Sequence, residues 1–491
     1  MFAHDFPDFV QCAEESNFGE HPKLPSGKRP MSAALTQKRA ARGRTTEHTI
    51  DPSRYTPHYA YRSSGRGSSK TDVLHCEGVS LARIADQDGT PAYIYSRASI
   101  ESAYRLLDGA FGSLPHSICY AVKANSNLAI LRVLARLGSS FDIVSGGELD
   151  RLRRIGVPRR RIVFSGVGKS RDEIRAALRY PDSRAGRGGI LLFNIESAAE
   201  LEVFLDEAAR HVAAGGEKPA AAIRVNPNVL AGGHPHISTG KPHHKFGIDW
   251  TEARRLYLAH ADSRVMAWRG ISSHIGSQIL SVAPYREALS RLAGFVRDLA
   301  GNGVPLEYID IGGGLGIRYT DEKPVVPDAF ARALGAIMRP LRCRLLIEPG
   351  RALVGPSGVL LTRVIYVKEN RGKRFVIVDA AMNDLIRPVL YNALHPITPA
   401  VRNISRGSSV EPADIVGPVC ESGDFLARDL LLPQVQAGDL LVIWAAGAYG
   451  FVQSSNYNAR RRPAEVLVES RRFRVIRSRQ TYDDLVRGEK A

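Results

Sequence analysis

The stretch ICYAVKAN at residues 118–125 joins a short apolar run to a lysine, and it is the first of eight such segments along the chain. Each segment has a few apolar residues of the kind found in buried strands, and a polar residue or a glycine ends it. The eight predicted strands are Ile118–Val122, Phe141–Val144, Ile162–Phe164, Ile190–Asn194, Ala221–Val225, Gly270–His274, Tyr308–Ile311 and Arg344–Ile347.

Segments with helical periodicity lie between these strands. Apolar residues recur at helical spacing in Leu128–Leu137, Ser197–Ala213, Thr251–Ala261 and Ala283–Ala300. Strands that alternate with helices pair in parallel through right-handed crossovers, and eight repeats favour a closed barrel over an open sheet. The sequence therefore predicts an α/β protein with a (β/α)8 barrel of the TIM type over residues 100–352.

Polar residues and glycines follow the predicted strands directly. In a (β/α)8 barrel the C-terminal ends of all strands meet at one mouth, where active sites lie. We therefore expect the following residues to gather at that mouth: Lys123, Ser145, Ser165, Glu196, Asn226, His274, Ser277, Gly312–Gly314 and Glu348.

The two ends of the chain differ from the barrel region. Residues 1–74 are rich in Ser, Gly, Arg and Pro without periodicity, which predicts a disordered basic extension; a start codon placed too early, with Met31 as the alternative, explains this stretch equally well. Residues 353–491 contain β-like runs and are expected to form a β-rich domain. Within residues 75–99, the run Ala92–Tyr95 is expected to add a strand to that domain.

Composition excludes several classes of protein. Of 491 residues, 44% are apolar and 24% are charged, which is typical of a globular chain. Lys and Arg number 67 against 50 Asp and Glu, but the resulting charge of +17 is dispersed, so no nucleic-acid partner is expected. The longest uncharged apolar run, Leu440–Val452, is too short to cross a membrane. The five scattered cysteines form no CxxC pair, and no secretion signal opens the chain, so we expect a cytoplasmic protein without a metal site.

Three features of the predicted mouth are candidates for a cofactor site. Lys123 ends an apolar strand, and partial burial is expected to lower its pKa and free the amine for a Schiff base, although a surface lysine is the plainer alternative. The Gly312–Gly314 turn can close on a phosphate, although such a turn often binds nothing. Glu348 and Arg351 bring a carboxylate and a guanidinium together, which is also compatible with a surface ion pair.

Taken together, these groups match the needs of pyridoxal 5′-phosphate. That coenzyme requires an amine for an imine, a grip on its phosphate, a side chain stacked on its ring and a partner for its pyridine nitrogen. Lys123, the triple glycine, His274 and Glu348 are the residues of the predicted mouth that suit these four tasks.

Nine motifs in order give the chain, from about residue 75 to 485, a resemblance to the fold-type III pyridoxal-phosphate-dependent decarboxylases. Within that family it is most similar to the members that act on meso-2,6-diaminopimelate. The motifs are YAVKAN at 120–125, FDIVSGGEL at 141–149, HKFGI at 244–248, HIGSQ at 274–278, DIGGGLG at 310–316, EPGR at 348–351, RPVLY at 387–391, CESGD at 420–424 and GAYG at 447–450.

The resemblance implies a role for each matching residue. Lys123 forms the Schiff base with the coenzyme, and Cys420 returns a proton to the decarboxylated carbon from the neighbouring subunit of a homodimer. The expected cofactor-binding residues are Lys123, Asp142, His274, Ser277, Gly312, Gly313, Gly314, Glu348, Gly350, Arg351 and Tyr449. The expected substrate-binding residues are Arg351, Arg387, Tyr391, Glu421 and Tyr449.

The predicted substrate follows from the groups far from Lys123. Diaminopimelate carries a second amino-carboxylate. The resemblance places Arg351, Arg387 and Tyr391 at its carboxylate and Glu421 at its ammonium, which is a complementary set for that group. The implied reaction yields L-lysine and CO2, the last step of lysine biosynthesis through diaminopimelate. Two alternatives stay open: a relative that acts on another basic amino acid or on carboxynorspermidine, and a catalytically inactive regulatory homologue. The presence of Lys123 and Cys420 argues against the second.

Overall fold

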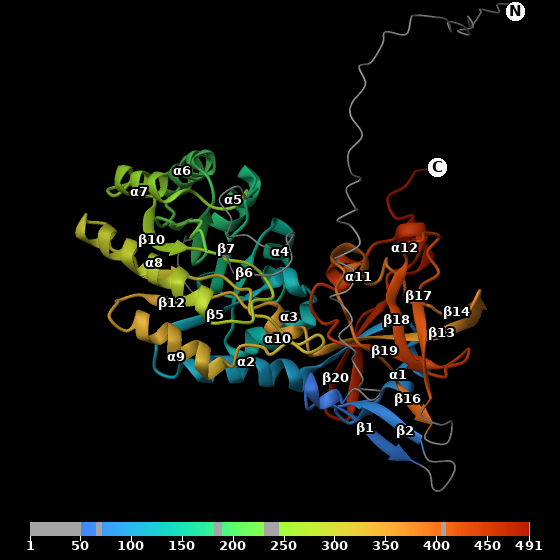
Figure 1. The fold of residues 1–491 in the computed structure, drawn as a ribbon. Helices are drawn as coiled ribbons and strands as arrows, with labels where there is room; N and C mark the ends of the chain where they lie inside the picture. The colour runs from blue at the N-terminus through green and yellow to red at the C-terminus, as the bar shows by residue number, and fades with distance from the viewer. Residues whose placement is uncertain (1–50, 65–70, 181–188, 230–244, 404–408, 491) are drawn as a thin grey trace, which may run out of the picture. The chain divides into compact units, whose positions relative to one another are not determined.

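The computed structural model describes residues 51–64, 71–180, 189–229, 245–403 and 409–490. Within them, eight parallel strands form a closed barrel in which each strand pairs with its neighbours in chain order and the last pairs with the first (Figure 1). The strands are β5 (His116–Ala121), β6 (Ser140–Ile143), β7 (Ile162–Phe164), β8 (Leu192–Ile195), β9 (Ala220–Arg224), β10 (Ala267–Ser272), β11 (Tyr308–Asp310) and β12 (Arg344–Ile347). The predicted (β/α)8 barrel is therefore confirmed, with small shifts at the strand ends.

Helices surround this barrel, and several begin at a side chain that caps them. They are α2 (Arg97–Phe111), α3 (Leu128–Leu137), α4 (Gly146–Arg154), α5 (Arg171–Leu178), α6 (Ala198–Ala213), α7 (Trp250–Ala259), α8 (Ala283–Gly301) and α9 (Pro327–Met338). Asn127, Ser145 and Ser197 each accept a backbone N–H from the first turn of the helix that follows. Ser145 and Ser197 come two residues after β6 and β8, and Asn127 follows the short turn after β5, so each cap fixes the point at which the chain turns back.

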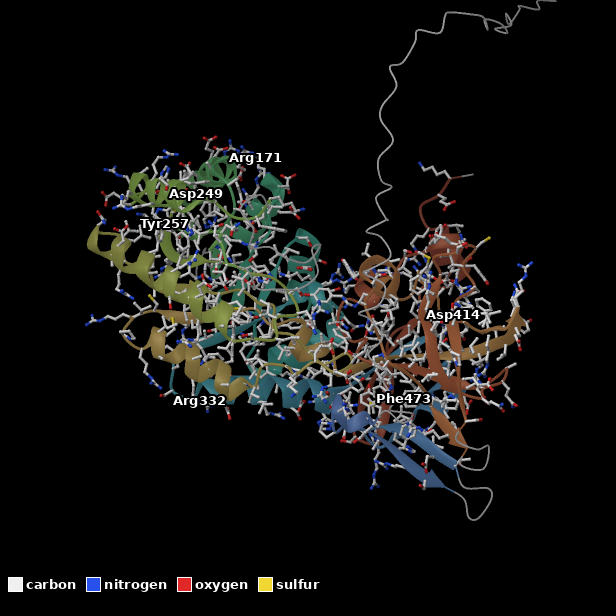
Figure 2. The ribbon with its side chains drawn as sticks, in the orientation of Figure 1. Arg171, Asp249, Tyr257, Arg332, Asp414 and Phe473 are labelled. Carbon is white, nitrogen blue, oxygen red and sulfur yellow. The ribbon has the colours of Figure 1, made fainter. Side chains whose placement is uncertain are left out.

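Side chains fill the barrel interior, so the barrel is a packed core. Cys119, Val163, Leu192 and Leu346 form one buried layer inside it. Outside, Tyr257 on α7, labelled in Figure 2, donates a hydrogen bond to the carbonyl of Gly270 at 2.7 Å. This contact ties the helix layer to β10 beside the register shift in that strand.

A second sheet is centred on the long strand β13 (Gly358–Asn370). It pairs with β4, β14 and β19, and the sheet runs in the order β18, β17, β14, β13, β4, β20, β21. β4 (Ala92–Ser96) covers the predicted strand Ala92–Tyr95 and leads directly into α2 of the barrel. The other strands of this sheet are β14 (Lys373–Val378), β15 (Ile397–Pro399), β17 (Val410–Val416), β18 (Phe425–Pro433), β19 (Leu440–Ile443), β20 (Ala464–Glu469) and β21 (Arg472–Arg477).

A smaller sheet corrects the predicted extent of the N-terminal extension. It contains β1 (Tyr59–Ser64), β2 (Thr71–Cys76), β3 (Val79–Ser80) and β16 (Val401–Asn403). Residues 1–50 and 65–70 lie outside the described residues, so the prediction stays untested there. The prediction of disorder is wrong for residues 59–64 and 71–74, because these residues form strands.

Aromatic residues explain this difference. Tyr59 is 1% exposed, and its ring meets that of Trp444 edge-on at 5.5 Å. Leu74 on β2 is fully buried in the same apolar cluster. Burial of side chains of this size contributes about 2 kcal/mol each, enough to hold a short strand against a larger sheet. The serines and arginines that predict disorder obscure this alternating pattern of apolar residues.

The remaining elements are short. They are α1 (Leu81–Asp88), α10 (Arg351–Val354), α11 (Arg387–Tyr391), α12 (Tyr482–Leu485) and the 3-10 turns η1 (Pro52–Arg54), η3 (Val122–Ala124), η4 (Arg159–Arg161), η7 (Phe451–Gln453) and η8 (Tyr457–Ala459). In the part of the chain that the structure describes, no helix combines the length and the apolar character that a membrane crossing requires.

Candidate active site

Lys123 lies in η3, directly after β5, and its ammonium donates a hydrogen bond to Asp142 Oδ2 at 2.8 Å. Asp142 belongs to the neighbouring strand β6 and is fully buried. Burial lowers the pKa of Lys123, but the charges of Asp142 and Glu348 outweigh that effect and raise the pKa above its ordinary value. The expected lowering of this pKa is therefore wrong, because the sequence argument did not count the carboxylates that converge on the amine.

Glu348 follows β12 and belongs to a network that crosses the barrel mouth. Ser165 donates to Glu348 Oε1 at 3.4 Å, and Asn194 donates to Asp310 Oδ2 at 3.1 Å. Burial, together with the charges of Asp142 and Asp310, raises the pKa of Glu348 well above its ordinary value. Burial also raises the pKa of Asp310, to about 6, so both carboxyls hold a proton more readily than an isolated carboxylate does.

His274 comes after β10 and contacts the triple glycine. Its Nδ1 accepts a hydrogen bond from the Gly313 N–H at 3.1 Å. Burial and the charges of Arg224 and Lys123 lower the pKa of His274 well below its ordinary value, so the imidazole is neutral. A Cβ at position 312 would lie 2.5 Å from His274 Nδ1, and one at position 314 would lie 2.2 Å from the carbonyl oxygen of Gly276. Only glycine allows this close approach of two loops.

Arg351, in the first turn of α10, joins two parts of the site. Its Nη2 donates to Ser277 Oγ at 3.0 Å, and its Nη1 donates to the hydroxyl of Tyr319. Its guanidinium lies 4.9 Å from the ring centroid of Tyr449. Gly350, which precedes it, packs so closely that an added Cβ would lie 2.8 Å from that of Ala124.

Arg387 begins α11 and lies close to the same tyrosine. Its guanidinium is 5.4 Å from the ring centroid of Tyr319 and 5.8 Å from that of Tyr391. Its Nε donates to His395 Nε2 at 3.2 Å. Burial lowers the pKa of His395 to about 3, so this histidine is a neutral acceptor. Among the described residues no carboxylate forms an ion pair with Arg351 or Arg387, although both are only 6% exposed.

The GAYG motif is held against the barrel mouth by backbone contacts. Tyr449 donates its N–H to the carbonyl of Ala124 at 2.8 Å, and Asn125 Nδ2 donates to the carbonyl of Gly447 at 3.1 Å. Both contacts involve the two residues that follow Lys123 in the chain. Two motifs more than 300 residues apart, YAVKAN and GAYG, therefore meet at one place.

Two predicted site residues lie apart from this group. Cys420 and Glu421 are exposed, in the turn between β17 and β18. The backbone N–H of Cys420 donates to Asn458 Oδ1 at 2.8 Å, and Glu421 interacts with Tyr457. None of the described contacts of Cys420 or Glu421 is with Lys123 or with the residues around it, so their roles stay predictions.

Three residues expected at the mouth have local tasks. Ser145 caps α4. Glu196 forms an ion pair with Arg224 at 2.8 Å and accepts a backbone N–H from the turn after β7. Asn226 accepts a backbone N–H from its own turn. These side chains stabilise the loops of the mouth.

Sequence reasoning missed three residues of the site. Asp310 ends β11 in the DIGGGLG motif, where its position two residues before the first glycine could have marked it. Tyr319 follows the same motif, but nothing in its local pattern indicates two arginine contacts. His395 lies in a stretch without periodicity, and no local signal points to it.

The residues at this mouth fit pyridoxal 5′-phosphate. Asp142 Oδ1 is buried and forms no hydrogen bond with any described residue, and the same holds for Arg351 Nε. The amine of Lys123 supplies an imine-forming group, and the glycines at 312–314 leave the backbone open where a side chain would block it. A neutral imidazole and a carboxyl with a raised pKa complete a set of groups suited to an anionic, aromatic coenzyme.

More than half of the chain matches a known family of proteins. Residues 97–355 match the family described as pyridoxal-dependent decarboxylase, pyridoxal binding domain. The chain therefore belongs to the pyridoxal-dependent decarboxylases, and pyridoxal 5′-phosphate is its coenzyme.

Its relatives within that family are diaminopimelate decarboxylases. The chain is 48% identical to diaminopimelate decarboxylase of Pseudomonas aeruginosa over 416 residues, which are 85% of this chain and 96% of the relative. It is 44% identical to the Aquifex aeolicus diaminopimelate decarboxylase over 433 residues, or 88% and 97% of the two chains. The structure of Helicobacter pylori diaminopimelate decarboxylase with L-lysine matches at a TM-score of 0.77 and 40% identity, over 83% of this chain and 98% of that one.

Proposed function

We propose that this chain decarboxylates meso-2,6-diaminopimelate to L-lysine and CO2. The observation that carries the proposal is the pair of buried guanidiniums, Arg351 and Arg387, for which the described residues supply no carboxylate. A buried cation without a partner is costly, so a ligand that brings its own carboxylate is favoured. Diaminopimelate brings one at the end away from the reacting carbon, whereas ornithine and arginine bring only a cation.

The residues around Lys123 have the properties that the chemistry needs. Pyridoxal 5′-phosphate, when bound, supplies an electron sink for the carbon that loses CO2. Lys123 provides the amine that holds the coenzyme through its aldehyde and that gives way to the substrate amine. The raised pKa of Glu348 suits its carboxyl to share a proton with the pyridine nitrogen. His274 offers a neutral ring for stacking.

The phosphate of the coenzyme has its own set of groups in this proposal. Ser277, the backbone of the Gly312–Gly314 turn and Tyr449 would hold it, and Arg351 would contribute charge from the side of Ser277. Arg351 thus serves both the coenzyme and the substrate, whereas Arg387 and Tyr391 serve the substrate alone.

We also propose a homodimer with shared active sites. Cys420 and Glu421 are exposed and have no contact with the Lys123 group of their own chain, so they suit a role in the site of a second copy. Leu390 and Leu394, on α11 and just beyond it, are 51% and 67% exposed and would be covered in such a dimer. Cys420 would then donate the proton that replaces CO2, and Glu421 would bind the distal ammonium.

A cytoplasmic location belongs to the same proposal. The four described cysteines, Cys76, Cys119, Cys343 and Cys420, are all free thiols, as is usual in a reducing compartment.

A substrate comparison tests the proposed function. Purified coenzyme-loaded protein is given diaminopimelate, L-ornithine or L-arginine, and released CO2 is measured. We expect turnover of diaminopimelate only, and we expect Arg387→Met to raise its KM on the order of 100-fold because a carboxylate loses its partner. Arg332→Met is the matched control, because Arg332 is exposed on α9, as labelled in Figure 2. Preferred turnover of ornithine or arginine would contradict the proposal.

A further inference from the structure

Tyr319 contacts both buried arginines of the site. It lies in the loop after the triple glycine and is itself only 6% exposed. The guanidinium of Arg351 is 5.8 Å from its ring centroid and that of Arg387 is 5.4 Å from it. Its hydroxyl accepts a hydrogen bond from Arg351. One side chain therefore links two cations that no described acidic residue pairs with.

This arrangement stabilises the cations without using up their capacity to bind an anion. The electron-rich ring of a tyrosine offsets part of the repulsion between two buried guanidiniums. An aspartate or glutamate in its place would neutralise one of the two charges and compete with a substrate carboxylate. The Nη1 and Nη2 groups of Arg387 form no hydrogen bond with the described residues, so they can donate to a carboxylate in a two-point contact.

The loop that carries Tyr319 is fixed at several points. Gln278 binds Ile317 through both ends of its amide, at 2.6 and 3.1 Å. Glu322 accepts the N–H of Tyr319 at 3.0 Å. Tyr55, just after η1, donates its hydroxyl to the carbonyl of Tyr319, also at 3.0 Å. The ring is thus held at a defined place by contacts on both sides of the loop.

A second path from Tyr55 reaches the other arginine. The Tyr55 ring stacks on Trp444 at 5.5 Å with an interplanar angle of 14°. The Trp444 carbonyl is 2.9 Å from His395 Nδ1, and His395 Nε2 accepts from Arg387. The neutral His395 therefore carries its proton on Nδ1 and donates it to Trp444. Both arginines are connected to the same N-terminal tyrosine.

We propose that Tyr319 is a positioning residue for the distal subsite, and that it sets the preference for an amino-carboxylate over a plain amine. It holds Arg351 and Arg387 ready for one carboxylate, and Tyr55 and His395 keep that arrangement in place. The proposal rests on the proposed function and adds the residue on which substrate selection depends.

A pair of ligands that differ only in the carboxylate tests this role. L-lysine retains the distal amino-carboxylate of diaminopimelate, and 1,5-diaminopentane lacks it. Binding of each to the coenzyme-loaded protein is measured by calorimetry for wild type, Tyr319→Phe and Tyr319→Leu. Tyr482→Leu is the matched control, because Tyr482 is 70% exposed and also lies under an arginine, Arg461, at 4.7 Å.

We expect Tyr319→Leu to weaken L-lysine binding about tenfold more than 1,5-diaminopentane binding, because it loses both the ring and the hydrogen-bond acceptor. Tyr319→Phe retains the ring, and its affinity should fall about threefold for L-lysine and not for 1,5-diaminopentane. This variant therefore tests the proposal even if the leucine variant does not fold. In turnover, KM for diaminopimelate should rise while kcat changes little.

Equal losses for the two ligands, or unchanged L-lysine binding, would overturn the proposal in favour of a role in packing. The wild-type assay separates this outcome from a failure of the proposed function. If wild type turns over diaminopimelate and the Tyr319 variants bind L-lysine as well as wild type, only the inference about Tyr319 fails. If wild type does not turn over diaminopimelate, the proposed function fails first.

Discussion

The carbonyl oxygen of Glu348 occupies the space in which a side chain of residue 313 would begin: a Cβ added to Gly313 would lie 2.1 Å from it. Glu348 is also the residue whose carboxyl we assign to the pyridine nitrogen. Gly313→Ala should therefore lower the free energy of unfolding by more than about 2 kcal/mol, because two backbone segments must separate. It should also weaken coenzyme binding.

Urea unfolding and coenzyme titration measure the two effects. Gly294→Ala, on α8, is the control, because nothing lies within 4 Å of its added Cβ. In a helix interior, that change should leave stability equal or slightly higher. Equal behaviour of the two variants would show that the close approach at Gly313 has no consequence.

Burial beside Asp142 and Asp310 raises the pKa of Glu348, so its carboxyl holds a proton more readily than an ordinary glutamate does. Glu348→Gln preserves its shape but removes the proton that can be shared with the coenzyme nitrogen. We expect kcat to fall about 100-fold or more while the dissociation constant of the coenzyme changes little. Steady-state kinetics and a coenzyme titration give the two numbers. An unchanged kcat would remove Glu348 from the mechanism.

The raised pKa of Glu148, on α4, predicts that the stability of the protein depends on pH. Burial raises its pKa from 4.5 to about 7, against the hydrogen bond that it accepts from the Val144 N–H. The folded protein therefore binds this proton more tightly than the unfolded chain, and the contribution to stability falls as pH rises from 4.5 to 7.

Glu148→Gln removes that dependence. The variant should equal wild type in stability near pH 4.5 and exceed it by about 1–2 kcal/mol above pH 7, less than full linkage because the side chain is partly exposed. Chemical unfolding at the two pH values checks this difference. If the variant were more stable than wild type at low pH and equal to it at high pH, the sign of the effect would be opposite and the prediction would be contradicted.

Cys420 provides a test of the shared active site. Lys123→Ala and Cys420→Ala should each be inactive alone. If each site takes Lys123 from one subunit and Cys420 from the other, random mixing of the two variants restores about a quarter of the wild-type sites, since half of the dimers have one intact site. The decarboxylase activity of the co-expressed variants measures the fraction of sites that is restored. No recovery, with a dimer present by light scattering, would place both residues in one chain's site.

The barrel could be predicted because its signal is local. Each strand is an apolar run that ends at a polar residue, and parallel pairing brings those ends together. Lys123, Asp142, His274 and Glu348 therefore converge as the motifs indicate. Their local patterns leave plainer readings open when each is taken singly, and the motifs taken together mark them.

Other features depend on contacts that sequence patterns do not contain. The pKa of Lys123 is set by carboxylates from two other strands. The role of Tyr319 depends on its contact with Arg387, which lies on α11, far along the chain. The role of His395 depends on its hydrogen bond with the Trp444 carbonyl. The strand at Tyr59 is stabilised by burial against residues far along the chain, which a composition argument does not detect.

The most direct measurement is the stoichiometry of the reaction with meso-2,6-diaminopimelate. Coenzyme-loaded wild type should release one CO2 for each L-lysine formed, and Lys123→Ala should release none and lose the visible absorbance of the bound coenzyme. Lys368→Ala, a change at an exposed lysine of β13, should behave as wild type. Loss of diaminopimelate without matching L-lysine and CO2, or unchanged turnover by Lys123→Ala, would contradict the account.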